Sequence, residues 1–349
     1  MDIFRHSIPR RELALAVVVV STVLAVGWHS LRTVEQALEA QLAAELQVSV
    51  REHASSVSRW LSHRSRIVES WAADTRVEAE AARLLHEPSP AALGRLRELI
   101  GPAVLSDGFV DFVLTDQASG VTVASLLDDP IGHRTLAPCG ELAGPVCLPF
   151  VSDENLPDAA QRFAPGRTTM FVTAPVHGPG GEVVARLSFR LDPEAGFQRL
   201  FPPGLLAFDS QGWLLSGPVR HRLASPDGSP MRFVAAAAEG GDGVSLDPVK
   251  DHRDVAVVAA WTPVTGQGFG IALTRDAAEA FQPLVRIQRQ FLALLALLIV
   301  SSGAVLLLDT RRRRVAARLA AILEASPLCL FVTNVRGESV HINRRCEGI

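Results

Sequence analysis

The chain lacks the residue patterns on which metal sites and most known catalytic motifs depend. Only four cysteines occur among its 349 residues, and the ten histidines are scattered, with no pair at metal-ligand spacing beside cysteines or acids. No nucleophile elbow is present, and the glycine repeat at 266–270 lies in an expected hairpin turn. We therefore expect no metal, no cofactor and no nucleic-acid partner, whereas a Ser-His-Asp set assembled from distant residues stays open.

Formal charge is absent from two long apolar stretches, residues 13–31 and 291–308. A helix rises about 1.5 Å per residue, so each stretch covers roughly 27–29 Å, close to the ~30 Å hydrocarbon core of a bilayer. The sequence predicts two transmembrane helices. The alternatives are a cleaved signal peptide for the first, although it is long for one and no small-residue cleavage site follows, and a buried core helix for the second.

Positive charge gathers at the two chain ends, although the formal net charge of the chain is −3. Segment 1–12 has three arginines against two acids, and segment 309–349 has eight against four. Basic residues beside a span stay on the cytoplasmic side. Both termini are therefore predicted to be cytoplasmic, and residues 32–290 to lie outside the inner (plasma) membrane. The arginines that anchor this two-pass topology are Arg10, Arg11, Arg311, Arg312, Arg313 and Arg314.

The outer block starts with a segment, 32–87, that contains neither glycine nor proline. Apolar residues recur there at helical spacing, which predicts a long stalk helix continuing from the first span. Its apolar stripe is expected to pack on the domain, and a seam in a homodimer is a compatible alternative.

Short apolar runs separated by turn residues follow Pro88 and predict four hairpins. They fall into two modules, about 95–195 and about 203–276, so we expect an α+β fold with two small antiparallel sheets. The paired strands are 109–116 with 121–127, 168–176 with 182–191, 205–209 with 213–217, and 255–264 with 269–275.

Three stretches of this block resemble the double Cache sensor domains of bacterial transmembrane receptors. They are TAPVHGPGGEVVARLSFRLDPEAGFQRLF (173–201), LLAFDSQGWLLSG (205–217) and VVAAWTPVTGQGFGIALTRDAAEAFQPL (257–284). The resemblance covers about 34–290 and implies two PAS-like modules on one long helix, with a small-molecule ligand in the distal module, about 95–195.

The chain departs from the members of that family that recognise amino acids. Those members hold the ligand with Tyr, Arg and a Trp-Tyr pair, but this chain has no tyrosine and no tryptophan between 72 and 212. Amino-acid specificity is therefore not expected. Arg134 and Arg167 are candidates for pairing with a ligand carboxylate, and Asp111 for facing a cation. For each of the three, a solvated surface charge is the alternative.

Two cysteines, Cys139 and Cys147, stand in the outer block with glycine and proline between them. An oxidising compartment permits a disulfide there. Cys329 and Cys346 would be cytoplasmic and reduced.

The sequence of segment 309–326 indicates a basic juxtamembrane helix, and strands are expected at 328–334 and 339–343. Residues 327–349 resemble the start of a cytoplasmic PAS domain but are too few to complete one. We therefore expect a truncated chain or a fragment, with a short self-contained tail as the alternative.

Together these features predict a two-span receptor that passes a ligand signal to a cytoplasmic PAS-linked output, a histidine kinase or diguanylate cyclase, or to a response regulator. Its other partners would be the lipid bilayer and a second copy. A chemotaxis-type receptor is the alternative, although no HAMP-like relay follows the second span. A membrane-anchored extracytoplasmic enzyme is a second alternative.

Overall fold

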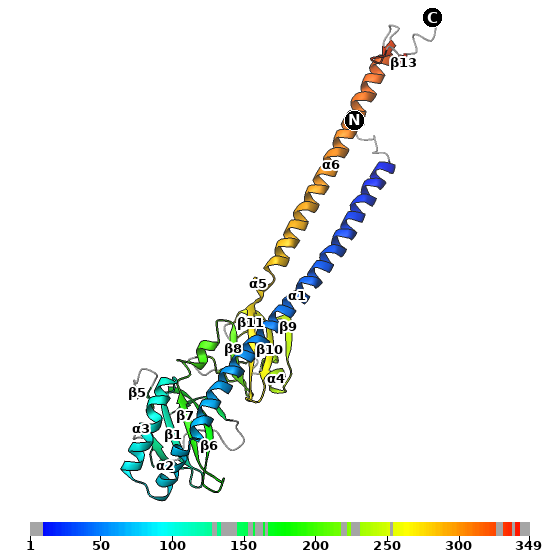
Figure 1. Cartoon of the computed structure of the whole chain (residues 1–349). Helices are drawn as coiled ribbons and strands as arrows, with labels where there is room; N and C mark the ends of the chain where they lie inside the picture. Colours follow the sequence, from blue (N-terminus) through cyan, green and yellow to red (C-terminus); the bar gives the residue numbers. More distant parts are fainter. Residues whose placement is uncertain are drawn as a thin grey trace. The chain divides into compact units, whose positions relative to one another are not determined.

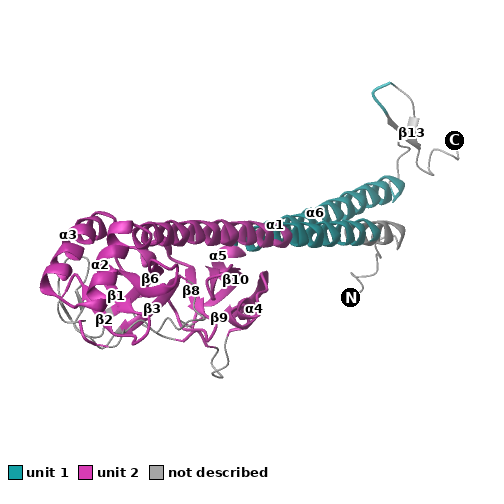
Figure 2. Ribbon diagram, turned by 60° about the horizontal axis from the view of Figure 1, so that its bottom comes forward, with its two compact units in different colours: residues 1–38, 282–349 teal, residues 39–281 magenta. Residues whose placement is uncertain are grey.

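The chain folds into two compact units, residues 39–281 and residues 1–38 with 282–349 (Figures 1 and 2). The larger unit contains both main sheets, and the smaller one is built from two long helices. The structure, a computed structural model, describes residues 10–127, 131–133, 145–152, 156–157, 163–164, 167–217, 222–224, 231–251, 254–325, 331–336 and 339–342.

Three helices precede the first sheet: α1 (Arg10–Ala72), α2 (Thr75–His86) and α3 (Pro90–Ser106). The segment predicted as one stalk helix, 32–87, is divided at Asp74. The Asp74 side chain accepts a hydrogen bond from the backbone N–H of Arg76 and so caps the start of α2. Because an N-cap aspartate satisfies backbone donors at a helix start, a new helix begins after Asp74 although the segment contains neither glycine nor proline.

The distal module is a five-stranded antiparallel sheet with the order β2-β1-β7-β6-β3. Two predicted hairpins are confirmed, as β1-β2 and β6-β7. Strand β3 and the short pair β4-β5 were not predicted. The strands are β1 (Asp111–Asp116), β2 (Thr122–Ser125), β3 (Val146–Ser152), β4 (Leu156–Pro157), β5 (Phe163–Ala164), β6 (Arg167–His177) and β7 (Val183–Leu191).

The second predicted module, about 203–276, is called the proximal module. It is a four-stranded antiparallel sheet with the order β8-β11-β10-β9. The hairpin predicted at 255–264 and 269–275 is confirmed, but segment 213–217 forms only isolated bridges instead of a strand beside β8. The elements are η1 (Phe197–Leu200), β8 (Leu205–Asp209), α4 (Arg232–Ala238), β9 (Gly243–Lys250), β10 (Ala256–Val264), β11 (Phe269–Asp276) and α5 (Ala277–Ala280).

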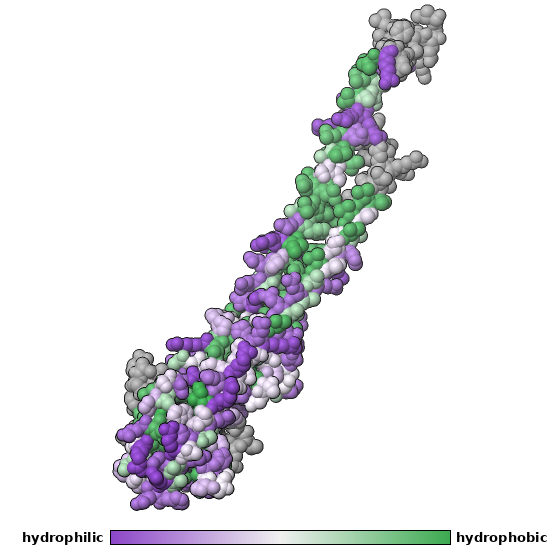
Figure 3. Space-filling view, viewed as in Figure 1, coloured by the Kyte–Doolittle hydropathy of each residue, from purple (hydrophilic) through white to green (hydrophobic). Residues whose placement is uncertain are grey.

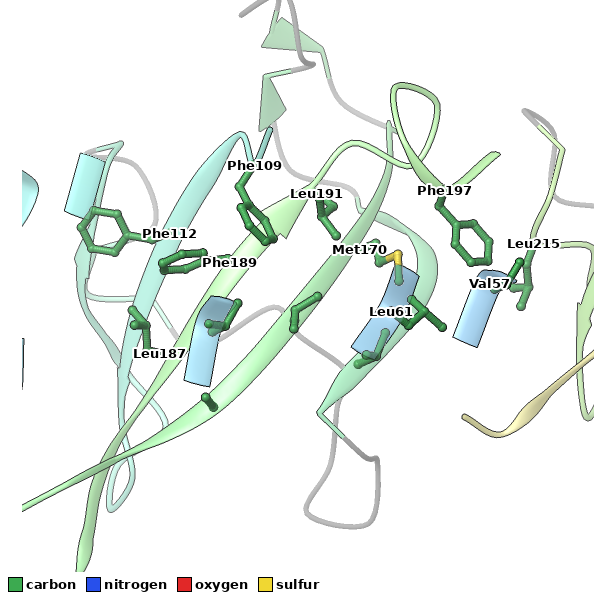
Figure 4. Close-up of a cluster of buried hydrophobic side chains, with 14 of the residues drawn as sticks. Val57, Leu61, Phe109, Phe112, Met170, Leu187, Phe189, Leu191, Phe197 and Leu215 are labelled. Atoms are coloured by element: carbon green, nitrogen blue, oxygen red, sulfur yellow. The ribbon is translucent and has the colours of Figure 1, made fainter. Parts of the chain in front are cut away.

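One apolar stripe of α1 supplies part of the core for both sheets. Leu46, Val50, Val57, Leu61 and Val68 follow one another at steps of four and seven and are fully buried. They belong to one cluster with side chains of the distal and proximal sheets, some of which Figure 4 shows around Val57 and Leu61. Burying each such side chain contributes about 1.5–3 kcal/mol. This part of the predicted stripe therefore packs on the domain.

A glycine starts the proximal sheet at a point of close backbone approach. Gly204 has a φ of +88°, and a Cβ there would stand 2.7 Å from the carbonyl oxygen of Thr274. Thr274 in turn donates to the Gly204 carbonyl oxygen through its N–H (2.7 Å) and through its hydroxyl (3.0 Å). Only glycine combines this conformation with this clearance, so the position fixes how the chain enters β8.

The smaller unit contains the start of α1 and the helix α6 (Gln282–Ala325). The two helices meet where the ring of Phe291 lies against Gly27. The unit ends in an antiparallel hairpin of β12 (Phe331–Thr333) and β13 (Ser339–Ile342), close to the strands predicted there. The assignment of this end to a PAS domain stays a prediction.

Among the helices of the described residues, one, α6, is long and apolar enough to cross a membrane. It contains the predicted second span, 291–308, whose hydrophobic side chains are visible in Figure 3. The predicted first span, 13–31, lies within α1, and several of its side chains are outside the described residues. Its crossing, and with it the two-pass topology, stays a prediction.

Candidate functional site

One face of the distal sheet is lined by buried polar side chains. Successive residues of a strand point to opposite faces, so Phe112 and Leu114 face the apolar core, whereas Asp111, Val113 and Thr115 point the other way. Cross-strand pairing extends this second face over β2, β7 and β6. We call the set the polar face, and it comprises Asp111, Thr115, Ser125, Thr169, Thr173, Ser188 and Arg190.

The centre of the polar face carries two opposite charges. Asp111 on β1 and Arg190 on β7 are directly paired across the strands, and their exposed fractions are 0% and 2%. Charged side chains this deeply buried are rare unless an opposite charge or a ligand pairs with them.

The Asp111 carboxylate is held from the side of β2. Ser125 Oγ lies 3.2 Å from each carboxylate oxygen, and the backbone N–H of Leu126 donates to Oδ1 at 3.1 Å. Burial raises the pKa of Asp111 to about 6, against the lowering by Arg190 and by these hydrogen bonds. Desolvation is the largest of these effects, so the carboxyl group is poised to change its charge in mildly acidic solution.

Hydroxyl groups surround the two charges. Thr173 Oγ1 and Ser188 Oγ share a hydrogen bond of 2.9 Å between β6 and β7. The Thr169 hydroxyl is fully buried and has no hydrogen-bond partner among the described residues. A buried hydroxyl without a partner costs about 1–3 kcal/mol, which a bound polar ligand or a water molecule would offset.

An apolar patch completes the same face. Val113, Cys147 and Phe171 form a small buried cluster, and the rings of Phe150 and Phe171 stack with centroids 6.1 Å apart. The face thus combines ionised groups, hydroxyls and aromatic surface, the mixture by which small-molecule sites fix orientation and gain affinity.

The predicted site residues fall partly within this face. Asp111 is at its centre, but as a buried carboxylate with hydrogen bonds and not as a surface charge. Arg167 is the first residue of β6, paired in register with Ser152, and its side chain is outside the described residues. Arg134 and Cys139 are also outside them. Cys147 is disulfide-bonded, and its predicted pairing with Cys139 stays a prediction.

Sequence reasoning missed Arg190, Ser188 and Thr169. A signal for the first two was present, because Ser188 and Arg190 alternate with Leu187, Phe189 and Leu191, which are buried in the core. Two polar residues at period two in an otherwise apolar strand indicate a second face, and the burial of that face was not visible in one strand alone.

No family model matches the chain, and no curated protein does. Several solved structures are similar to it at low identity. The ligand-binding domain of the Pseudomonas fluorescens chemoreceptor CtaA, in complex with L-leucine, is 19% identical, with 70% of this chain and 99% of that chain covered and a TM-score of 0.47. The sensor domain of the V. cholerae histidine kinase DctB is 16% identical, with 68% and 98% covered and a TM-score of 0.49. The ligand-binding domain of the Pseudomonas aeruginosa PAO1 amino acid chemoreceptor PctB, in complex with L-Arg, is 15% identical, with 69% and 98% covered and a TM-score of 0.45.

Proposed function

We propose that the chain is a membrane receptor of the double Cache type whose distal module binds a small extracytoplasmic molecule. The observation that carries this proposal is the polar face. Asp111 and Arg190 are buried there beside Phe171, and so is the Thr169 hydroxyl, which finds no hydrogen-bond partner within the described part of the chain. A purely structural sheet face has no need to bury two opposite charges, because apolar residues would fill the same space at lower desolvation cost.

The ligand class that fits is a small polar molecule with at least one ionised group. A guanidinium donates hydrogen bonds to a carboxylate or phosphate group, a carboxylate accepts them from an amine, and the aromatic rings cover an apolar part of the ligand. Signal transfer would then use α6, which continues from the proximal module through the predicted span 291–308 to Ala325. The proposal also includes two-pass insertion, a homodimer and transfer of the signal to a PAS-linked cytoplasmic output.

The test is a thermal-unfolding screen of the full chain in nanodiscs against amino acids, organic acids, amines and purines. A ligand at 100 times its dissociation constant should raise the free energy of unfolding by about 2.7 kcal/mol. Arg190→Gln should abolish that stabilisation, whereas Arg199→Gln, an exposed arginine of η1, should keep it. A full panel without any shift would refute the proposed function, and turnover of the stabilising compound would favour an enzyme instead.

A further inference from the structure

A groove outside the polar face lies where α1 meets the proximal sheet. It is a groove of about 480 Å³ between α1 and the end of β10, which we call the α1 groove. Its α1 wall carries Arg51, Ser55, Ser58 and Arg59, and its other wall carries Thr262 of β10 and Thr265, the first residue after β10. Nothing in the proposed function uses these side chains.

The α1 groove is cationic and rich in hydrogen-bond donors. Two arginines and no carboxylate line it. The hydroxyls of Ser55, Ser58, Thr262 and Thr265 make no hydrogen bond among the described residues, although Thr262 is buried. A surface that gathers two positive charges and four available hydroxyls is complementary to an anion with several oxygen atoms.

Both guanidinium groups keep free donors. An arginine has five N–H groups. Arg51 uses Nε and Nη2 on Asp242, with an Nε to Oδ2 distance of 3.1 Å, and Arg59 uses Nη2 on Ser56 Oγ at 3.0 Å. The two arginines are eight residues apart on the helix, about 12 Å along its axis, so their side chains can hold the two ends of one small molecule.

We propose that the α1 groove binds a small organic polyanion, with one carboxylate or phosphate group on Arg51 and another on Arg59, and with the hydroxyls of Ser58 and Thr262 between them. Asp242 competes with such a ligand for Arg51, since it already occupies part of that guanidinium. Binding therefore weakens the ion pair that joins the loop before β9 to α1. A higher concentration of the anion would therefore weaken the contact between the loop before β9 and α1.

Citrate and inorganic phosphate are the probes, added to the full chain in nanodiscs against potassium chloride at matched ionic strength, with binding measured by calorimetry. We expect saturable citrate binding that weakens roughly tenfold or more in Arg59→Gln, because a charge-assisted hydrogen-bonded contact is lost. Arg66→Gln is the matched control, since Arg66 is an exposed α1 arginine outside the groove whose Nε donates to the Ser62 carbonyl oxygen at 3.4 Å. Phosphate binding of equal strength would identify a phosphate ligand, and weaker phosphate binding a polycarboxylate.

Two further variants separate binding from folding. Thr262→Val keeps the shape of a buried side chain and should weaken citrate binding severalfold. Asp242→Asn removes the competitor and should tighten it, a result that a merely structural role for the ion pair does not produce. No citrate binding above the chloride control, or equal binding by Arg59→Gln and Arg66→Gln, would overturn the proposal. Arg190→Gln should leave citrate binding intact, so failure of the distal site and failure of the groove are distinguishable.

Discussion

At the scale of single residues, the charge of Asp111 depends on two opposing effects, because burial raises its pKa while Arg190 and hydrogen bonds lower it. Its pKa is about 6 in the folded chain and near 3.8 when unfolded. Between these two pH values the native state binds more protons than the unfolded state, so the free energy of unfolding falls as pH rises from about 4 to about 6 and levels off above. The raised pKa thus makes the ionised carboxylate a cost to stability near neutral pH.

Replacing Asp111 with Asn should flatten this part of the stability profile. A shift of about two pKa units corresponds to about 3 kcal/mol as an upper bound, and Asn keeps an oxygen that accepts from Leu126. The measurement is denaturant unfolding of wild type and variant between pH 4 and 7. Asp247→Asn, an exposed position of β9, should keep the wild-type slope. Equal slopes in wild type and Asp111→Asn would contradict the raised pKa.

Single residues were the least predictable level. Asp111 was selected from the sequence as a ligand contact, but its burial and its cross-strand partner Arg190 depend on the register between two strands, and the two residues are 79 positions apart in the sequence. Residue type and strand period show that a face is polar. Whether that face is covered depends on chain segments elsewhere, and one sequence does not supply that information.

At the scale of elements, Arg64 links α1 to the end of α3. Its guanidinium carbon Cζ lies 5.3 Å from the centroid of the Trp60 ring and 5.1 Å from that of the Phe109 ring. Its Nη1 donates to the carbonyl oxygen of Asp107, the C-cap residue of α3. Burial lowers its pKa, while the charge of Asp107 acts in the opposite direction. A cation at a helix C-terminus is also favoured by the helix dipole.

Arg64→Met should lower the free energy of unfolding by about 1–3 kcal/mol, because it removes two cation–π contacts and a charge-assisted hydrogen bond but keeps an apolar stem. Arg66→Met, two residues further along α1 and exposed, should stay within about 0.5 kcal/mol of wild type. Chemical denaturation of the full chain measures both. Similar losses in the two variants would show that Arg64 has no special anchoring role.

The contact between α1 and α6 depends on Gly27. A Cβ at this position would stand 2.4 Å from the Phe291 ring, so a side chain forces the ring or the helix to move. Gly27→Leu should therefore destabilise the helix pair by about 1–3 kcal/mol, as overpacking does. Gly303→Leu on α6 is the control, since no atom lies within 4 Å of its added Cβ.

Thermal unfolding in detergent micelles is the measurement for this pair. Phe291→Ala in the same chain should recover most of the loss caused by Gly27→Leu, since it removes the clashing ring. A Gly27→Leu chain as stable as the Gly303→Leu chain would rule out the close contact.

Elements were predicted well where their pattern is local. Three of four hairpins are confirmed, because alternation and turn residues act within about twenty residues. The break in 32–87 was missed, since Asp74 reads as an ordinary helix-surface acid until its side chain caps α2. Strand β9 was missed because its alternation of Val244 and Leu246 with polar residues is short, and Pro248 interrupts it.

At the scale of the whole molecule, membrane orientation is the central prediction. With Cys329 and Cys346 changed to serine, a membrane-impermeant maleimide should label Ser119→Cys in intact cells and Arg336→Cys only after the membrane is opened. Both positions lie in exposed turns. Arg336→Cys labelled in intact cells, or Ser119→Cys protected there, would contradict the two-pass arrangement, which rests on the flanking arginines and on apolar length.

Architecture at this scale was largely predictable. An α+β chain with a long N-terminal helix and two antiparallel modules follows from the turn spacing and from the glycine-free segment, and the structure confirms it. The strand orders did not follow, because they depend on which edges meet after the hairpins have formed.

The shared apolar stripe of α1 limits how a sheet of this chain could be replaced by a sheet from another protein. Leu46 and Val50 belong to the same cluster as Leu61 and Val68, and that cluster also includes Phe189 of the distal sheet and Ile271 of the proximal one. If one module alone were replaced, the apolar side chains of α1 would no longer match the surface of the new sheet. Functional chimeras should therefore be cut so that each sheet travels with its own stretch of the helix, and single-module transplants should yield insoluble protein.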